Sequence, residues 1–440
     1  MRIGGNSSAR PAQVLAIACS VGALVASSAA LAVAQGRPRS GAKAAAAPAA
    51  PAPPFVTMAQ PCPPIRPPSR VPGQPPVATQ AGVADQPAAA GAGQPEGAGA
   101  GSQGPAPFRR EPPELGVPGR GVLGGVCLTA ADSMVQTIVA RLDFDSFKGL
   151  IKGLTQFGDR EQGTERNAGA VNWIDDQLKT WGYATERVKY DYLGSPREEV
   201  FATKVGSTVP QEMYILGAHM DGRGAGQAAD DDGSGTALVM EIARVLASPD
   251  VQTTRSVRFA LWNNEETGLN GAKAYVEQRQ ILQGVETGNS GKYAEPKWLG
   301  IIQHDMLLWD HGNPSMSTQS LDADVNVEFQ LNSAKAGESA QLGVAVINAN
   351  RMFATNYPAQ LSNSMSNTDT GPFQDLIPSV SLRENRRLYE MGRGSNPTYH
   401  QPSDLFVSFS DADFRLGFNA AQTTLGAVAK LVEAKIAPKS

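Results

Sequence analysis

Two spacings of apolar residues run through the chain from about residue 128, and each predicts a different kind of element. Residues 131–142 and 167–183 repeat their apolar residues every three or four positions, which is typical of amphipathic helices. Shorter segments rich in β-branched and aromatic residues follow Gly182 and predict strands at 184–193, 198–206 and 212–222. This first part therefore combines helices with a group of strands.

The same two patterns alternate through the rest of the chain. Helical spacing predicts helices at 233–248, 268–280 and 419–434. Apolar runs predict strands at 255–266, 297–307 and 376–385. Strands that alternate with helices indicate an α/β fold, here a three-layer sandwich of helices around a mixed, mostly parallel sheet.

The first 126 residues follow neither pattern. Residues 1–34 place two arginines before an apolar stretch that closes on Ala32-Val33-Ala34, which predicts a cleaved signal peptide and a secreted or periplasmic protein. If the segment is not cleaved, it would anchor the chain in a membrane. Residues 35–126 read as a disordered tether, because 20 of the chain's 32 prolines fall between 36 and 120. The folded domain is expected at 127–440, and Cys62 and Cys127 can form a disulfide that ties the tether to it.

Charge separates these two parts of the chain. Residues 1–126 carry ten Lys or Arg and four Asp or Glu, whereas the remainder holds 28 basic and 38 acidic residues. An acidic domain argues against nucleic acid as a partner, because nucleic acid attracts basic surfaces. It suits a protein that neutralises carboxylates with bound cations. The sequence gives no indication of an oligomeric state.

Polar residues gather where three apolar strands end. His219 and Asp221 end one strand, Glu265 and Glu266 end another, and Asp305 follows a third. Taken singly, each reads as a helix cap or a surface residue. The carboxyl ends of parallel strands meet at one sheet edge, where converging acids are costly unless a cation compensates them.

Imidazole and carboxylate ligands suit zinc, and several carboxylates allow two ions at one site. The chain has four histidines, and His400 in "NPTYHQPSD" is the candidate for a second imidazole ligand. "AADDDGSGTA" adds three consecutive aspartates at residues 230–232, in the loop after His219 and before a predicted helix.

Five separated motifs, "GAHMDG", "ADDDGSGTA", "WNNEETGLNGA", "IIQHDM" and "YHQPSD", resemble in this order the M28 zinc metallopeptidases of the two-zinc aminopeptidase type. The resemblance runs from about residue 165 to the C-terminus and implies a zinc exopeptidase fold with two Zn²⁺ ions per chain. It implies that His219 and Asp305 bind one ion, that Glu266 and His400 bind the other, and that Asp231 bridges the two. It also implies Glu265 as general base and Asp221 as the carboxylate that orients the imidazole of His219.

The chemistry of the residues agrees with these roles. A carboxylate can bind one metal with each oxygen, so Asp231 can bridge, and the Asp221 carboxylate can fix the tautomer of His219. Asp232 or Ser234 can cap the following helix. Asp230 has no such role and is expected to cap the loop or to be solvated.

Some positions depart from the family. The usual Ser-Asp-His is Thr368-Asp369-Thr370, which leaves a role for Asp369 open, and Gln401 replaces the usual Thr after the last histidine. His304 should point to the other face of its strand and be structural. Met306, Trp262 and Trp309 are expected in the core rather than in a side-chain pocket.

The predicted function is an exported zinc exopeptidase that hydrolyses the N-terminal residue of peptides with a Glu general base. A zinc carboxypeptidase or dipeptidase of the same family is the first alternative. Three arginines in "RENRRL", Arg383, Arg386 and Arg387, can bind a free carboxylate, although a solvated loop is the expected reading. A glutaminyl cyclase and a catalytically inactive binding ectodomain are the further alternatives.

Overall fold

The computed structural model describes residues 128–288, 290, 292–311, 319, 323–385 and 396–438. The predicted signal peptide, the tether, Cys62 and Cys127 lie outside the described residues. Arg386 and Arg387 lie outside them as well.

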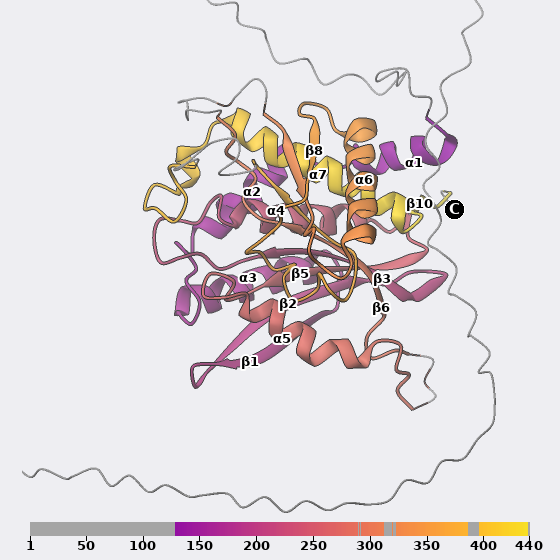
Figure 1. Cartoon of the computed structure of the whole chain (residues 1–440), viewed down its shortest axis with the longest axis horizontal. Coiled ribbons are helices and arrows are strands. Elements are labelled where there is room, and N and C mark those ends of the chain that lie inside the picture. The colour runs from indigo at the N-terminus through magenta and orange to yellow at the C-terminus, as the bar shows by residue number, and fades with distance from the viewer. Residues whose placement is uncertain are drawn as a thin grey trace, which may run out of the picture. The chain divides into compact units, whose positions relative to one another are not determined.

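An eight-stranded sheet forms the middle of the domain (Figure 1). Across the sheet the strands are β1 (Thr185–Tyr192), β2 (Ser195–Lys204), β5 (Arg255–Trp262), β3 (Val209–His219), β6 (Lys297–His304), β9 (Ser379–Arg383), β7 (Val325–Glu328) and β8 (Ala359–Ser362). The central strands β5, β3, β6 and β9 run parallel, while β2 pairs antiparallel with β5 and β7 pairs antiparallel with β9. The predicted mixed sheet is confirmed.

Helices cover both faces of this sheet. They are α1 (Ala130–Val139), α2 (Phe144–Thr155), α3 (Glu165–Thr180), α4 (Gly233–Leu246), α5 (Asn270–Arg279), α6 (Ala336–Phe353) and α7 (Asp411–Leu431). In Figure 1, α5 lies below the sheet, whereas α4 and α7 lie above it. Side chains alternate along β3 accordingly: Leu216 packs in the cluster with α4 and α7, and Ile215 packs in the cluster with α5. The predicted three-layer α/β architecture is confirmed.

Side-chain caps determine where several helices begin. Thr129 and Ser410 each form a capping box with the aspartate three residues later, at the starts of α1 and α7. Asp143 caps α2 by accepting a hydrogen bond from the backbone of Ser146. Because Ser410 fixes the start of α7, this helix begins eight residues before the predicted residue 419.

The helices α2 and α6 and the strands β7 and β8 were absent from the sequence-based expectations, as were the two-residue strands β4 (Val251–Gln252) and β10 (Lys435–Ile436), which pair with each other outside the main sheet. Strands β7 and β8 have four residues each, which is too short for an alternating pattern to be distinctive. Helix α6 contains Gly337 and Gly343, and glycine inside a helix weakens the sequence signal. At Gly343 an added Cβ would lie 2.6 Å from Leu361 Cδ1, so close packing against β8 requires the small residue.

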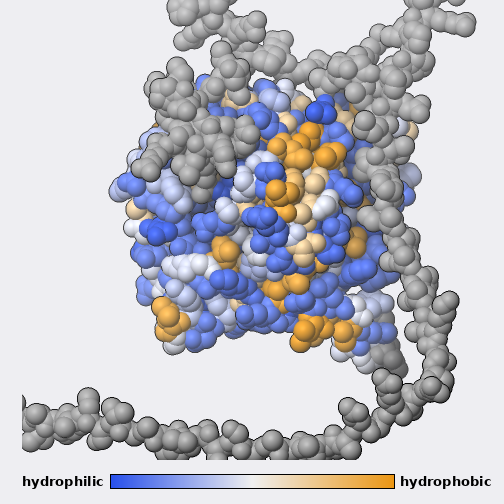
Figure 2. Space-filling view, in the orientation of Figure 1, coloured by the Kyte–Doolittle hydropathy of each residue, from blue (hydrophilic) through white to orange (hydrophobic). Residues whose placement is uncertain are grey.

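One face of the domain can be followed in Figure 2. Hydrophilic residues cover most of the face drawn in Figure 2, and apolar residues form small groups between them. Among the described residues, no helix combines the length and the apolarity needed to cross a membrane.

Candidate metal centre

The ends of three parallel strands bring the candidate ligands to one edge of the sheet. His219 is the last residue of β3, Asp305 directly follows β6, and Glu265 and Glu266 follow β5 within four residues. Because β5, β3 and β6 are adjacent and parallel, their carboxyl ends lie side by side.

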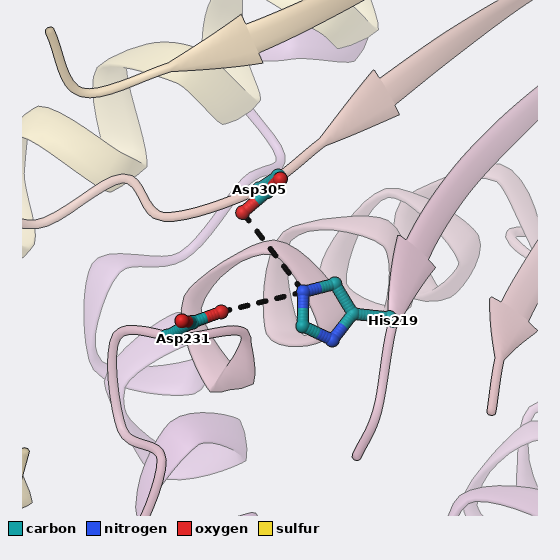
Figure 3. A group of neighbouring side chains, drawn as sticks. All are labelled: His219, Asp231 and Asp305. Atoms are coloured by element: carbon teal, nitrogen blue, oxygen red, sulfur yellow. Dashed lines mark ion pairs between the residues drawn. The ribbon is translucent and has the colours of Figure 1, made fainter. Parts of the chain in front are cut away.

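A first group consists of His219, Asp231 and Asp305, all of them buried (Figure 3). The Nε2 atom of His219 lies 3.3 Å from Asp231 Oδ1 and 3.9 Å from Asp305 Oδ1. Figure 3 shows both carboxylates directed at this one nitrogen. One nitrogen and two oxygens that face a common point form a donor set suited to zinc.

A second group consists of Asp231, Glu266 and His400. The Nε2 atom of His400 lies 3.2 Å from Asp231 Oδ2 and 3.0 Å from Glu266 Oε2. Asp231 therefore turns one oxygen to each group. The structure thus brings together the five side chains that the sequence predicted as ligands.

The donor atoms of this site fit metal ions. The second carboxylate oxygen of Glu266, Oε1, is buried and has no hydrogen-bond partner among the described residues. A buried unpaired carboxylate oxygen is costly, and a cation would satisfy it. In each group the three ligand atoms lie within 4.8 Å of one another.

The pKa values of the site reflect both the burial of its ionisable groups and the nearby carboxylates. Burial raises the pKa of Glu265 to about 9; nearby His219 opposes this shift, and Asp369 and Asp305 add to it. Burial lowers the pKa of the His400 imidazole, but Asp231 and Glu266 outweigh it and raise the value to about 9. Both shifts show that the side chains around Asp231 favour added positive charge.

The structure changes the expected role of Asp221. The Nδ1 atom of His219 lies 3.1 Å from the backbone oxygen of Asp221 and 3.7 Å from its carboxylate Oδ1. With the proton on Nδ1, the imidazole donates to the carbonyl, and the carboxylate instead accepts from the backbone N–H groups of Glu265 (3.1 Å) and Glu266 (3.4 Å). Asp221 thus holds His219 with its backbone and the Glu-Glu pair with its side chain.

Asp232 caps the helix after the triplet, as predicted. Its Oδ1 accepts from the backbone N–H of Gly235 at 2.9 Å, at the start of α4. The same carboxylate also accepts from the backbone N–H groups of His219 (3.1 Å) and Met306 (3.2 Å). One side chain therefore fixes the start of α4 against the ends of β3 and β6.

The expectation that Asp230 is solvated is wrong. Its side chain is fully buried, and Oδ1 accepts from the backbone N–H groups of Leu307 (2.9 Å) and Leu308 (3.0 Å). Its Oδ2 accepts from Asn396 Nδ2 at 2.9 Å. Asp230 thus connects the triplet to the segment after Asp305 and to the segment before His400.

The reading of Arg383 as part of a solvated loop is also wrong. Arg383 ends β9 and is buried, and its Nη2 donates to Asp305 Oδ2 at 2.7 Å.

Asp369, one of the positions that depart from the family pattern, is buried and accepts from Gln303 Nε2 at 3.1 Å. It therefore has a packed, hydrogen-bonded place beside the site.

His304 is structural, as predicted. Its Nδ1 lies 2.9 Å from the backbone oxygen of Gly217, and its Nε2 lies 2.8 Å from Thr424 Oγ1. Burial lowers the pKa of this imidazole to about 4, so it is neutral and packs as a core residue. Met306, Trp262 and Trp309 are buried as well, which confirms their expected place in the core.

Two residues that organise the site were not expected from the sequence. Arg160 is fully buried, and its guanidinium donates three bonds of 2.7 Å to the backbone oxygens of Met220, Gln227 and Ala228. Asp404 accepts from the backbone N–H groups of Asp230 (2.9 Å) and Asp231 (3.2 Å). The position of Asp404 in the "YHQPSD" motif was an available signal, whereas nothing in the letters around Arg160 marks it.

The two groups open onto a pocket beside Glu265. Its lining residues are His219, Arg223, Asp231, Glu265, Glu266, Gly268, Asp305, Asn367, Tyr399 and His400. A ligand that enters this pocket meets both candidate metal groups and a carboxyl group, Glu265, that neither group uses.

Sequence comparisons point to one family. Peptidase family M28 matches residues 199–415. Leupeptin-inactivating enzyme 1 of Streptomyces exfoliatus is 26% identical over 180 residues, which are 41% of this chain and 37% of that protein. A probable lipoprotein aminopeptidase of Mycobacterium tuberculosis is 41% identical over 92 residues, which are 20% of this chain and 18% of that protein. The chain thus spans less than half the length of these relatives.

Solved structures share the fold. The LapA aminopeptidase of Legionella pneumophila superposes with a TM-score of 0.53 at 18% identity, over 68% of this chain and 74% of that one. A glutaminyl cyclase of Porphyromonas gingivalis superposes with a TM-score of 0.50 at 16% identity, over 66% of this chain and 98% of that one. At these identities the likeness concerns the fold.

Replacing Asp230 with alanine should destabilise the protein. The change leaves the buried backbone N–H of Leu308 without its acceptor. It also removes one of two acceptors from the Leu307 N–H and from the amide of Asn396, so we expect a loss of about 1–3 kcal/mol in the free energy of unfolding. Urea titration followed by circular dichroism measures it, with Asp176→Ala on the exposed face of α3 as the control. Equal stability of the two variants would contradict the role given to Asp230.

Replacing Arg160 with methionine should weaken metal binding, although Arg160 is no candidate ligand. The loop between His219 and Asp230 loses the three bonds that fix it, so we expect zinc affinity to fall about 10- to 100-fold. Competition with a chromogenic chelator measures this affinity, with Arg351→Met on α6 as the control. A folded Arg160→Met protein with the zinc affinity of the wild type would refute this positioning role.

Proposed function

Residues 199–415 of the chain belong to peptidase family M28, and from this membership and the geometry of the site we propose that the protein is a zinc-dependent exopeptidase. It removes the N-terminal residue of peptides. The observation that carries the proposal is Asp231, which turns one carboxylate oxygen to each of two histidine-containing groups. We further propose that residues 127–440 form the catalytic domain and that residues 1–34 direct export.

Two zinc ions per chain are part of this proposal. His219 and Asp305 would hold one ion, Glu266 and His400 would hold the other, and Asp231 would bind both. When bound, the ions supply an activated water and a positive charge beside the scissile carbonyl oxygen.

Glu265 is the proposed general base. It lines the pocket, is 8% exposed, and belongs to neither three-residue group. Its carboxylate takes the proton of the attacking water and passes it to the amine nitrogen as the carbon–nitrogen bond breaks. Because Glu265 is only 8% exposed, bulk water has little access to the proton between these two steps.

Asp221 keeps this base in position. Its carboxylate accepts from the backbone N–H of Glu265, and its backbone oxygen accepts from the imidazole of His219. Asp221 therefore fixes the position of the proposed base relative to a proposed metal ligand. Positioning of this kind fixes the distance between base and water without taking part in the proton transfer.

The alternatives differ in the substrate or in the use of metal. A carboxypeptidase or dipeptidase would use the same donor set, and a glutaminyl cyclase shares the fold. A binding ectodomain would not need a complete donor set together with a buried acid in the same pocket. The names of the aminopeptidase relatives favour the aminopeptidase, and the relative named a lipoprotein is consistent with export.

A pair of substrates tests the proposed function directly. The purified protein should hydrolyse an aminoacyl-p-nitroanilide and not the same compound with an acetylated amine, because an aminopeptidase requires a free N-terminus. Release of nitroaniline is followed by absorbance. Cleavage confined to N-blocked peptides, from the C-terminal end, would establish a carboxypeptidase instead.

Two variants should separate metal binding from proton transfer. Glu265→Gln should retain about two zinc ions per chain and lose at least 100-fold in kcat, because the amide cannot accept the proton. Asp231→Ala should lose both zinc and activity, since it removes an oxygen from each group. Zinc is measured by atomic emission on the dialysed proteins. Substantial turnover by Glu265→Gln would refute the mechanism, and zinc-loaded Asp231→Ala would refute the bridge.

A further inference from the structure

Of the described residues that line the pocket, Arg223 is the one lysine or arginine. It lies in the loop between β3 and α4, four residues beyond His219. Its side chain is 57% exposed, so the guanidinium is at the rim of the pocket rather than in the core. A cation at this place meets the substrate before the substrate reaches the candidate ligands.

The guanidinium has donors to spare. Nη1 lies 3.5 Å from the backbone oxygen of Glu266 and 3.8 Å from its carboxylate Oε2. Both contacts are long for a charged donor, since strong bonds of this type measure about 2.7–2.9 Å. Arginine carries five N–H donors in a planar fork, which matches the two oxygens of a carboxylate.

The loop presents Arg223 from a fixed backbone. Gly224 has φ of 73°, a conformation that favours glycine, and an added Cβ on Gly222 would lie 2.4 Å from the Cβ of Ala228. Arg160 binds the backbone oxygens of Met220 and Ala228 on either side. The side chain of Arg223 can move, but its Cα cannot move far from the pocket.

The charge balance of the pocket makes Arg223 available to an anion. Four carboxylates line the pocket, Asp231, Glu265, Glu266 and Asp305. On the proposed function, two zinc ions balance these four charges, and Glu266 is occupied as a ligand. Arg223 then leaves the pocket with a surplus positive charge close to the reacting centre.

We propose that Arg223 is a specificity-determining residue that binds a carboxylate of the substrate, and that the preferred substrates are dipeptides. This rests on the proposed function. The C-terminal carboxylate of a dipeptide lies one residue beyond the scissile bond, about 3.5 Å of extended chain, which suits a cation beside Glu266. An acidic side chain on the second residue of a longer peptide would offer the same chemistry.

Matched substrates test this proposal. We compare kcat/KM for leucyl-alanine and leucyl-alanine amide, which differ in the terminal carboxylate, at low ionic strength. The wild type should prefer the free acid about tenfold or more, mainly through KM, and Arg223→Gln should reduce this preference at least fivefold. Arg223→Lys should retain part of it. Arg351→Gln, an exposed arginine on α6 that does not line the pocket, should behave as the wild type.

A second substrate pair distinguishes the two sources of the carboxylate. Leucyl-aspartic acid α-amide carries only a side-chain carboxylate, and leucyl-asparagine amide carries none. A preference for the first that depends on Arg223 identifies an acidic second residue as the ligand. A preference confined to the dipeptide acid identifies the chain terminus.

Equal use of acid and amide by the wild type, or an equal loss on both in Arg223→Gln, would overturn the proposal. Calorimetric titration of zinc-loaded Glu265→Gln with leucyl-alanine and with its amide separates this outcome from failure of the proposed function. One outcome is that the acid binds more tightly than the amide in a way that depends on Arg223, while the wild type hydrolyses neither compound. That result would support the carboxylate site and refute the exopeptidase. Equal dissociation constants would refute the carboxylate site alone.

Discussion

The negative charge gathered around Asp231 is the constraint on which the rest of the site depends. Asp230, Asp231 and Asp232 are consecutive and buried, and Asp404 lies against their backbone. Buried carboxylates of this density are tolerated only where donors or cations face each of them. Asp230 and Asp232 accept hydrogen bonds from buried backbone N–H groups and are structural. Asp231 lines the pocket and is a candidate ligand.

Backbone amides provide most of the structural compensation. Asp232 accepts from three backbone N–H groups, and Asp230 accepts from two. These amides belong to the ends of β3 and β6, to the start of α4 and to the segment after Asp305. The acids therefore tie together the elements that carry the candidate ligands. Arg160 adds a buried guanidinium: burial lowers its pKa, and the nearby carboxylates of Asp404, Asp221 and Asp232 oppose this shift.

The five candidate ligands could be predicted from the sequence because apolar strands end in polar residues, and parallel strands share an edge. The partners of Asp230 could not, since its donors are backbone amides of Leu307 and Leu308, some 77 residues away. Every residue except proline has a backbone N–H, so the residue types in a sequence do not show which N–H will donate to a given carboxylate. Arg383 shows the opposite failure: its charged neighbours in "RENRRL" indicate solvent, yet it is the last residue of β9 and is buried beside Asp305.

Arg383 also makes the two candidate groups chemically different. Each group contains one histidine and two carboxylates, with Asp231 in common. In the first group, Asp305 turns Oδ1 toward His219 while Arg383 holds Oδ2 at 2.7 Å. In the second, Oε2 of Glu266 faces His400, and its Oε1 has no hydrogen-bond partner among the described residues. The guanidinium of Arg383 thus draws negative charge from the Asp305 carboxylate, whereas no guanidinium lies within 3.5 Å of the Glu266 carboxylate among the described residues. Two groups with the same residue classes therefore differ in donor strength, and the difference comes from β9, outside either group.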